Sequence, residues 1–219
     1  MIDTHCHMDD PQYADDIENF LAVQRESGVE AILVPGVEAA TTQDVLNVCA
    51  RYPKYLYPAL GLHPENVKED WQEQLASIKN AVDNLVKTSP HALIAIGEIG
   101  LDYYYDFAPR DLQKEILKKQ IILADKLGLP CVFHVRDAME QQKEALREQM
   151  CWAEQYDLPV MIHSRDATED TLKILREYPT VRGVMHCFSG SHEVAEQVVQ
   201  MGYYLGIGGV LTFKNCKLA

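Results

Sequence analysis

Short apolar segments alternate along the chain with longer segments in which apolar residues recur every three or four positions. The longer segments predict amphipathic helices, the clearest over about 10–28, 70–87, 110–127 and 191–202. Gly28 and Gly128 follow two of them as helix stop signals. The short segments predict buried strands at 1–3, 31–34, 55–62, 93–99, 131–134, 160–163, 184–187 and 203–207.

This alternation of strands and helices is typical of a parallel sheet covered by helices. Eight strand candidates predict an α/β fold of TIM type, a (β/α) barrel of parallel strands ringed by helices. No glycine-rich phosphate-binding motif follows the first strand, which weakens the alternative of an open nucleotide-binding sheet. No linker or low-complexity segment interrupts the pattern, so residues 1–219 are expected to form a single barrel domain.

One part of the chain is repeated at an offset of 29 residues. Leu129-Pro130 recurs as Leu158-Pro159, and the segment 134–138 recurs as 163–167 with only its second residue changed. The repeat units, 109–137 and 138–166, each comprise one helix and one strand. Two arrangements are open. The extra unit takes a full place in the barrel, or one copy is extruded or exchanged with a partner chain, which leaves the closure incomplete.

Composition narrows the possible functions. With 20 Lys+Arg against 33 Asp+Glu, the net charge of −13 argues against a broad, nonspecific nucleic-acid surface. It allows phosphate chemistry at a metal, because a bound cation reverses the local field. No apolar run is long enough to span a membrane. Six scattered cysteines without an export signal predict reduced thiols and a cytoplasmic location.

Side chains that can bind a metal recur where the strand candidates end. His5 and His7 follow the first strand and, being two residues apart, face the same way. Glu98 lies at the end of the fourth. Three more strands end in His134, His163 and His186. Each of these three alone is more simply a satisfied core histidine, but the carboxyl ends of barrel strands gather at one mouth. Their convergence predicts a site for one or two metal ions.

Other side chains near the same mouth are candidates for substrate contacts. His63 ends the third strand and would either donate to a phosphate or cap the backbone. Arg136 and Arg165 follow the repeated histidines and would either bind phosphate through two hydrogen bonds or pair with neighbouring aspartates. Tyr103 begins a run of three tyrosines that would either stack on single-stranded nucleic acid or pack the loop. No serine or cysteine nucleophile motif is present, which favours a metal-activated water.

Together these motifs resemble the TatD family of metal-dependent deoxyribonucleases, a branch of the amidohydrolase-like barrels. The matching segments, 3–7, 59–64, 97–103, 163–167, 186–190 and 206–213, follow the family's order and span nearly the whole chain. The resemblance implies hydrolysis of phosphodiester bonds in DNA with two divalent ions (Mg, Mn or Zn). It implies that His5 and His7 bind one ion and that Glu98 bridges both. A fifth-strand histidine and the His186 position would bind the second ion, and His63 would contact a substrate phosphate.

Two departures from the family pattern bear on the site. The repeat leaves the fifth-strand ligand open between His163, in the more family-like sequence, and His134, which directly follows the Glu98 unit. The family also has a final strand with a metal-binding Asp that acts as base, and no residue up to Ala219 matches it.

The sequence therefore predicts a TatD-type hydrolase in which Glu98 is catalytic and His63, Arg165 and Tyr103 bind substrate. The expected partner is DNA or another phosphodiester, with no membrane. The alternatives are a catalytically impaired metal-binding protein derived from such a nuclease, and a hydrolase of other ester or amide bonds. The expected assembly is a monomer, or a dimer formed by exchange of the duplicated unit.

Overall fold

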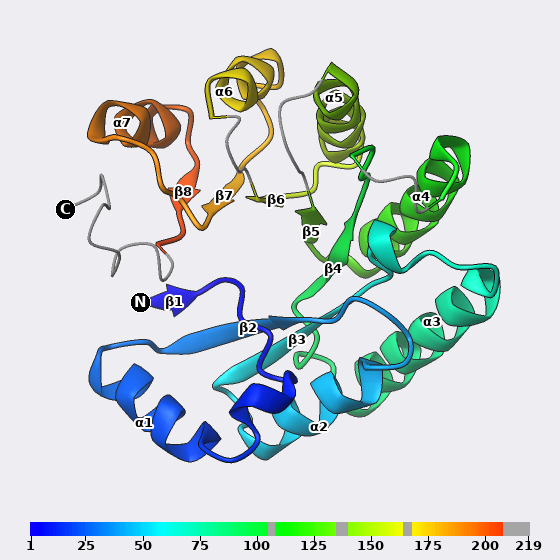
Figure 1. Ribbon diagram of the computed structural model, residues 1–219, viewed down its shortest axis with the longest axis vertical. Coiled ribbons are helices and arrows are strands. Elements are labelled where there is room, and N and C mark those ends of the chain that lie inside the picture. Colours follow the sequence, from blue (N-terminus) through cyan, green and yellow to red (C-terminus); the bar gives the residue numbers. More distant parts are fainter. Residues whose placement is uncertain (105–107, 135–139, 164–167, 208–219) are drawn as a thin grey trace.

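The computed structural model describes the chain except for residues 105–107, 135–139, 164–167 and 208–219. Eight parallel strands lie in chain order in one curved sheet with helices around its outside (Figure 1), which confirms the predicted TIM-type architecture. The strands are β1 (Ile2–Asp3), β2 (Ala31–Pro35), β3 (Leu56–Leu60), β4 (Ala95–Gly100), β5 (Cys131–His134), β6 (Val160–His163), β7 (Gly183–His186) and β8 (Tyr204–Leu205).

The helices connect successive strands and cover the sheet with their apolar faces. They are α1 (Ile17–Glu26), α2 (Thr42–Arg51), α3 (Trp71–Thr88), α4 (Arg110–Leu127), α5 (Glu140–Gln155), α6 (Thr168–Glu177) and α7 (His192–Gln200), with short 3₁₀ turns η1 (Pro11–Tyr13) and η2 (Pro64–Asn66). The helix expected from residue 10 starts later, because Asp10 caps the η1 turn by accepting from the backbone N–H of Gln12. Helix α2, which buries Val45, Val48 and Cys49, is not among the helices predicted from the sequence.

Both copies of the repeat contribute a strand to the sheet. β5 and β6 lie side by side, with Cys131 opposite Val160, and their bounds differ by the repeat offset. Neither strand is extruded, so the extra unit takes a full place in the sheet. The helix-to-strand turn is also copied: the N–H of Leu129 donates to the carbonyl of Ala124 (3.0 Å), and the N–H of Leu158 donates to that of Ala153 (2.9 Å).

Among the described residues, no hydrogen-bonded ladder closes the sheet. Within the described residues β1 pairs only with β2 and β8 only with β7, which leaves a seam between the first and last strands. At the carboxyl end of the seam the segments after β1 and β8 touch, since a Cβ on Gly206 would lie 3.1 Å from the Thr4 hydroxyl. At the amino end, Ile2 is 64% exposed and Tyr204 is 76% exposed. In the part of the chain that the structure describes, the closure is therefore incomplete, and it is tightest near the carboxyl ends of the strands.

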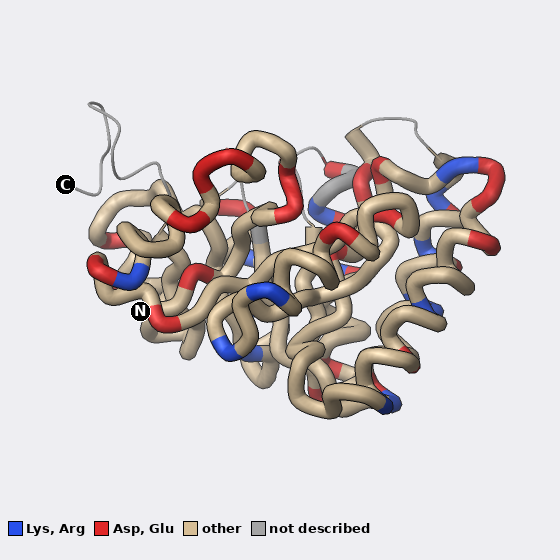
Figure 2. Tube along the Cα trace, turned by 90° about the horizontal axis from the view of Figure 1, so that it is seen from below, with Lys and Arg blue, Asp and Glu red and all other residues tan. Residues whose placement is uncertain are grey.

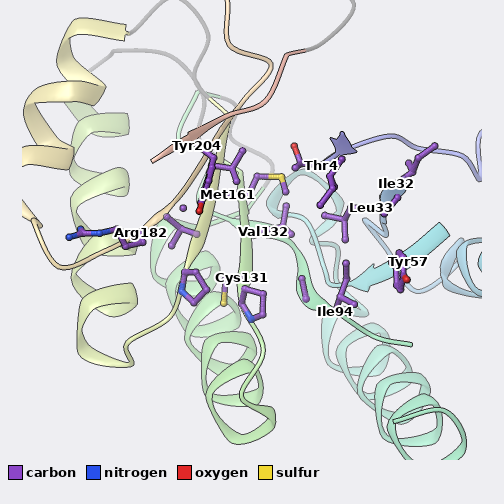
Figure 3. A pocket seen from close by; sticks show the side chains of 18 residues that line it. Thr4, Ile32, Leu33, Tyr57, Ile94, Cys131, Val132, Met161, Arg182 and Tyr204 are labelled. Atoms are coloured by element: carbon purple, nitrogen blue, oxygen red, sulfur yellow. The ribbon is translucent and has the colours of Figure 1, made fainter. Parts of the chain in front are cut away.

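The amino-terminal half of the barrel interior is not filled by side chains. A cavity of about 350 Å³ lies there, lined almost entirely by apolar groups from all eight strands. Figure 3 shows Leu33, Val132 and Met161 among the side chains around it. TIM barrels normally fill this space with layers of side chains. The packing that fixes the mouth of the barrel therefore lies at the other end of the strands.

The surface carries the charge expected from the composition. In Figure 2, Lys and Arg form short, separated stretches among Asp and Glu rather than one continuous basic stripe. Within the residues that the structure describes, no helix has both the length and the apolar character needed to cross a membrane. The five described cysteines form no disulfide.

The turn between helix and strand gives a matched pair of positions for a stability test. Gly128 (φ 63°) and Asp157 (φ 51°) occupy the same left-handed position in the two copies. Glycine adopts this conformation without steric cost, whereas other residues are strained by roughly 1–2 kcal/mol. We expect Asp157→Gly to raise the free energy of unfolding by about 0.5–1 kcal/mol. We expect Gly128→Asp to lower it by a similar amount, both measured by urea denaturation. A loss of stability in Asp157→Gly would contradict this account.

Candidate metal centre

Six of the predicted site residues meet at the carboxyl ends of the strands. Parallel strands bring these ends to one edge, so residues distant in sequence become neighbours. Glu98 lies within β4 and is buried. The five histidines come from four other strands and the segments that follow them: His5 and His7 after β1, His63 after β3, His134 at the end of β5 and His186 at the end of β7.

The two carboxylate oxygens of Glu98 face different histidines. Oε2 lies 3.4 Å from Nε2 of His5. Oε1 lies 3.2 Å from Nδ1 of His134 and 3.8 Å from Nε2 of His63. Glu98 is therefore shared by two groups, His5–His7–Glu98 and His63–Glu98–His134, and within each group the donor atoms lie within 4.8 Å of one another.

The geometry of the first group fits a divalent metal ion. Nε2 of His5 and Nε2 of His7 are 3.1 Å apart. Two donors bound to one ion at about 2.1 Å lie roughly 3 Å from each other. Imidazole nitrogens with a carboxylate oxygen suit zinc, manganese and similar ions. Because the residues converge with this spacing and chemistry, they could hold a metal.

The two remaining histidines occupy different positions relative to this centre. The ring of His186 stacks on that of His5, with centroids 4.5 Å apart and an interplanar angle of 26°, which joins β7 to the residues after β1. His163 is opposite His186 in the sheet register, but its side chain lies outside the described part of the structure. Arg136 and Arg165 lie outside the described residues altogether. Of the two repeat histidines, His134 is the one whose contact with Glu98 lies within the described part of the structure.

His63 fits both alternatives left open by the sequence. Its Nδ1 accepts from the backbone N–H of Glu65 at 3.2 Å and so caps η2. This bond fixes the ring with Nε2 turned toward Glu98. Burial, together with the nearby charge of His134, lowers the pKa of His63 to about 3. His63 is therefore a neutral side chain near pH 7.

The burial of Tyr103 argues against the stacking role predicted for it. Its side chain is 8% exposed, and the Arg110 guanidinium lies 4.6 Å from the ring centroid. The next residue, Tyr104, is 48% exposed and is the accessible aromatic of the described part of this run. The alternative interpretation from the sequence, that the tyrosine packs the loop, describes Tyr103.

The charges of the centre are strongly coupled. Burial alone would raise the pKa of Glu98, but the hydrogen bond from His134 and the electrostatic influence of the neighbouring imidazoles of His5 and His63 hold it below its ordinary value. Burial alone would lower the pKa of His134, but hydrogen bonds to Asp102 and Glu98 raise it to about 9. In the metal-free protein Glu98 is thus a carboxylate, and His134 is an imidazolium between two carboxylates.

Asp102 also belongs to this centre, although no role is predicted for it from the sequence. Its Oδ2 lies 3.0 Å from Nε2 of His134, and the residue is 1% exposed. The donor atoms of Glu65, Asp102 and His134 also lie within 4.8 Å of one another. The available signal was the position of Asp102, four residues after Glu98 in a segment that ends a buried strand.

Two buried glutamines of α4 hold the loops that carry His63 and Asp102. Gln120 accepts from the N–H of Leu62 (2.7 Å) and donates to its carbonyl (3.1 Å). Gln113 does the same for Asp102, at 2.9 and 3.0 Å. Each amide satisfies both backbone groups of a loop that lacks a partner strand there. Helix α4 therefore fixes the loops that follow β3 and β4.

The copy of Gln120 in the second repeat unit lacks a loop partner. Gln149 is equivalent to Gln120 and is fully buried. Its Nε2 donates to the carbonyl of Ala145, but its Oε1 has no hydrogen-bond partner among the described residues. Gln120 bonds Leu62, which lies two residues after the end of β3. One strand further along the sheet, the equivalent position is Asp102, two residues after the end of β4. Gln113 already occupies the backbone of Asp102, which explains why Gln149 has no loop to hold.

The sequence is similar to a family model and to named proteins. The family described as TatD related DNase matches residues 2–141 and, separately, 138–219. The chain is 35% identical over 217 residues to the uncharacterized metal-dependent hydrolase YabD of Bacillus subtilis, covering 99% of this chain and 72% of that protein. It is 28% identical over 210 residues to a protein of Erwinia tasmaniensis named 3'-5' ssDNA/RNA exonuclease TatD, covering 95% and 68%.

The fold of a solved relative is also similar. The crystal structure of YjjV, a TatD homologue from Escherichia coli, superposes with a TM-score of 0.57 at 32% sequence identity. The match covers 97% of this chain and 70% of that chain. Sequence and fold therefore point to the same family.

The paired glutamines give a second matched stability test. Methionine has nearly the shape of glutamine but makes no strong hydrogen bond. We expect Gln120→Met to lower the free energy of unfolding by at least about 2 kcal/mol, because it leaves the N–H and C=O of Leu62 buried and unpaired. We expect Gln149→Met to be neutral or stabilising. Chemical denaturation measures both, and equal losses would show that Gln149 has a partner after all.

The position of His134 between two carboxylates predicts a pH-dependent contribution to stability. Its pKa is about 9 in the fold against 6.5 ordinarily. The contribution is therefore complete below pH 6.5 and is lost as the pH rises through 9. In protein stripped with EDTA, we expect His134→Gln to lower the free energy of unfolding by about 3–5 kcal/mol at pH 6. At pH 9.5 the loss should be smaller.

The control for this experiment is His192→Gln, since His192 is an exposed residue on α7. Urea denaturation at the two pH values should show no comparable loss in that variant. A penalty for His134→Gln that does not change with pH would contradict an imidazolium at this position.

Proposed function

Because this chain belongs to the TatD family of metal-dependent hydrolases, we propose that it is a nuclease that hydrolyses phosphodiester bonds in DNA. The observation that carries this proposal is Glu98, a buried carboxylate whose two oxygens face different groups of histidines. Such an arrangement suits two ions that share one carboxylate. Two-metal sites of this kind are used for displacement at phosphorus.

In this proposal His5, His7, Glu98, His134 and His186 hold two divalent ions, Mg, Mn or Zn. The ions would supply an activated water and neutralise charge on the phosphoryl group. We assign the fifth-strand ligand to His134 rather than His163, because His134 lies 3.2 Å from Glu98. The stacked ring of His186 lies beside His5, within the same mouth.

The chain's own residues would bind and orient the phosphate. His63 is neutral near pH 7, and its Nδ1 accepts a backbone N–H, so its Nε2 carries a proton toward the centre. That proton could be donated to a phosphate oxygen. Arg165 follows the second repeat histidine in sequence and remains our candidate for a second phosphate contact.

The acidic surface favours a substrate that is recognised at the centre. Lys and Arg form no continuous stripe in Figure 2, so long-range attraction of a duplex has little support there. A single-stranded end could enter the mouth and offer one phosphate at a time. The relative named 3'-5' ssDNA/RNA exonuclease makes such ends the first substrates to test.

The test is hydrolysis of end-labelled single-stranded DNA, duplex DNA and RNA by purified protein with Mg²⁺ or Mn²⁺. We expect cleavage of single-stranded DNA that EDTA abolishes. We expect the His5→Ala/His7→Ala variant, and separately Glu98→Ala, to lose roughly 100-fold or more, since metal-assisted stabilisation of the transition state is worth several kcal/mol. His192→Ala, on the exposed face of α7, is the control and should retain activity.

Two other outcomes correspond to the alternative functions. Stoichiometric metal binding with turnover no faster than that of the His5→Ala/His7→Ala variant would indicate a catalytically impaired metal-binding protein. Metal-dependent hydrolysis of carboxyl esters, amides or phosphotriesters, without cleavage of nucleic acid, would indicate a different hydrolase. Either result would overturn the nuclease proposal.

A further inference from the structure

The carboxylate of Asp102 makes a direct contact with an imidazole of the candidate metal centre. From this contact we infer that Asp102 is a positioning residue, which holds His134 so that its Nδ1 is the nitrogen presented to a metal ion. Asp102 Oδ2 lies 3.0 Å from Nε2 of His134, on the side of the ring away from Glu98. The inference rests on the metal-binding role proposed above for His134.

The Asp102 carboxylate is itself fixed from several sides. Its Oδ1 accepts from the backbone N–H of Tyr104 at 2.9 Å. Its own backbone N–H and C=O are both bonded to Gln113 of α4, at 2.9 and 3.0 Å. With 1% of its surface exposed, the residue has little room to turn away from His134. A rigid acceptor of this kind can set the orientation of the ring that it contacts.

The acceptor also selects which imidazole nitrogen is available. An ionised carboxylate only accepts hydrogen bonds, so Nε2 of His134 must be the donor toward Asp102. The lone pair that a metal needs is then at Nδ1, the nitrogen 3.2 Å from Glu98. Metal-binding histidines commonly donate their other N–H to a carboxylate, and loss of that carboxylate typically costs 10–100-fold in metal affinity or activity.

A competing role uses the same residues. Glu65, Asp102 and His134 form a third group whose donor atoms lie within 4.8 Å of one another. A metal bound there would use Nε2 of His134 and would break the hydrogen bond to Asp102. In the positioning role, His134 would bind the metal through the nitrogen that faces Glu98, and Asp102 would bind none. In the competing role, His134 would bind through the nitrogen that faces Asp102, and Asp102 would itself be a ligand. The two roles therefore predict different metal stoichiometries when Asp102 is replaced.

The decisive variant is Asp102→Asn. The asparagine oxygen can still accept from the N–H of Tyr104, while its NH₂ group now faces Nε2 of His134. That group donates, so the proton of the imidazole moves to Nδ1 and the metal-binding lone pair is lost. The matched control is Asp83→Asn on α3, a half-buried aspartate outside the centre that pairs with Lys79. His134→Gln and the double variant Asp102→Asn/His134→Gln complete the set.

Binding of Co²⁺ alone to metal-free protein is measured by titration calorimetry and by the visible spectrum of the bound ion. We expect Asp102→Asn to weaken one binding step by about 10–100-fold, to change the spectrum of that step and to leave the other step within twofold. His134→Gln should weaken the same step. The double variant should bind no more weakly than His134→Gln, because Asp102 acts through that ring. Asp83→Asn should match the wild type.

Several results would overturn the inference. Losses that add in the double variant, or that affect both steps equally, would indicate a general structural role for Asp102. Loss of one whole equivalent of Co²⁺, with the His134 step unchanged, would make Asp102 a metal ligand. Absence of Co²⁺ binding in the wild type would overturn both this inference and the metal site. No substrate is present, so failure of the nuclease proposal alone leaves these measurements valid.

Should Asp102→Asn lack a cooperative thermal transition by circular dichroism, Asp102→Ser serves in its place. The serine hydroxyl is smaller and polar, and it removes the charge without adding bulk to a buried position. The same step should weaken in that variant, and unchanged Co²⁺ binding would overturn the inference.

Discussion

The mouth of the barrel depends on one buried charge, the carboxylate of Glu98. Burying an ionised carboxylate costs several kcal/mol unless charged or hydrogen-bonding partners surround it. The partners come from three other parts of the barrel: His5 after β1, His63 after β3 and His134 on β5. Satisfying Glu98 therefore requires these strands to end at the same level around it. That requirement and the metal chemistry select the same geometry.

Around this charge lies a second layer of buried polar groups. Asp102 contacts His134 at Nε2, the nitrogen that does not face Glu98. Helix α4 bonds the loops after β3 and β4 through Gln120 and Gln113. One helix thereby fixes the loop that carries His63 and the loop that carries Asp102. Since the amino-terminal half of the interior contains a cavity of about 350 Å³, this layer and the strand ends must position the centre without a fully packed barrel beneath them.

The strands and the ring of candidate ligands could be predicted from the sequence because each signal is local. An apolar run that ends in His or Glu gives both the strand and the direction of its polar end, as at Cys131–His134 and Gly183–His186. The second layer has no such signal. Gln120 forms a hydrogen bond with the backbone of Leu62, 58 residues away. In the helix sequence it has no feature that distinguishes it from an exposed polar residue. The burial of Tyr103 under Arg110 is likewise a tertiary contact.

The duplication shows why copied sequence does not always give copied contacts. The turn geometry was reproduced, including a left-handed residue at Asp157 where the first copy has Gly128. A local turn depends only on the copied residues. Gln149 was reproduced as well, but the loop it would hold was already bonded to Gln113, so its oxygen is left without a partner among the described residues.

A contact between a repeat unit and the rest of the barrel depends on which strand lies next to that unit in the sheet. His134 ends β5, the strand that lies next to β4, and it contacts Glu98 for that reason, because Gly100 and His134 are neighbours in the sheet register. For His134, position in the order of strands accounts for the contact with Glu98.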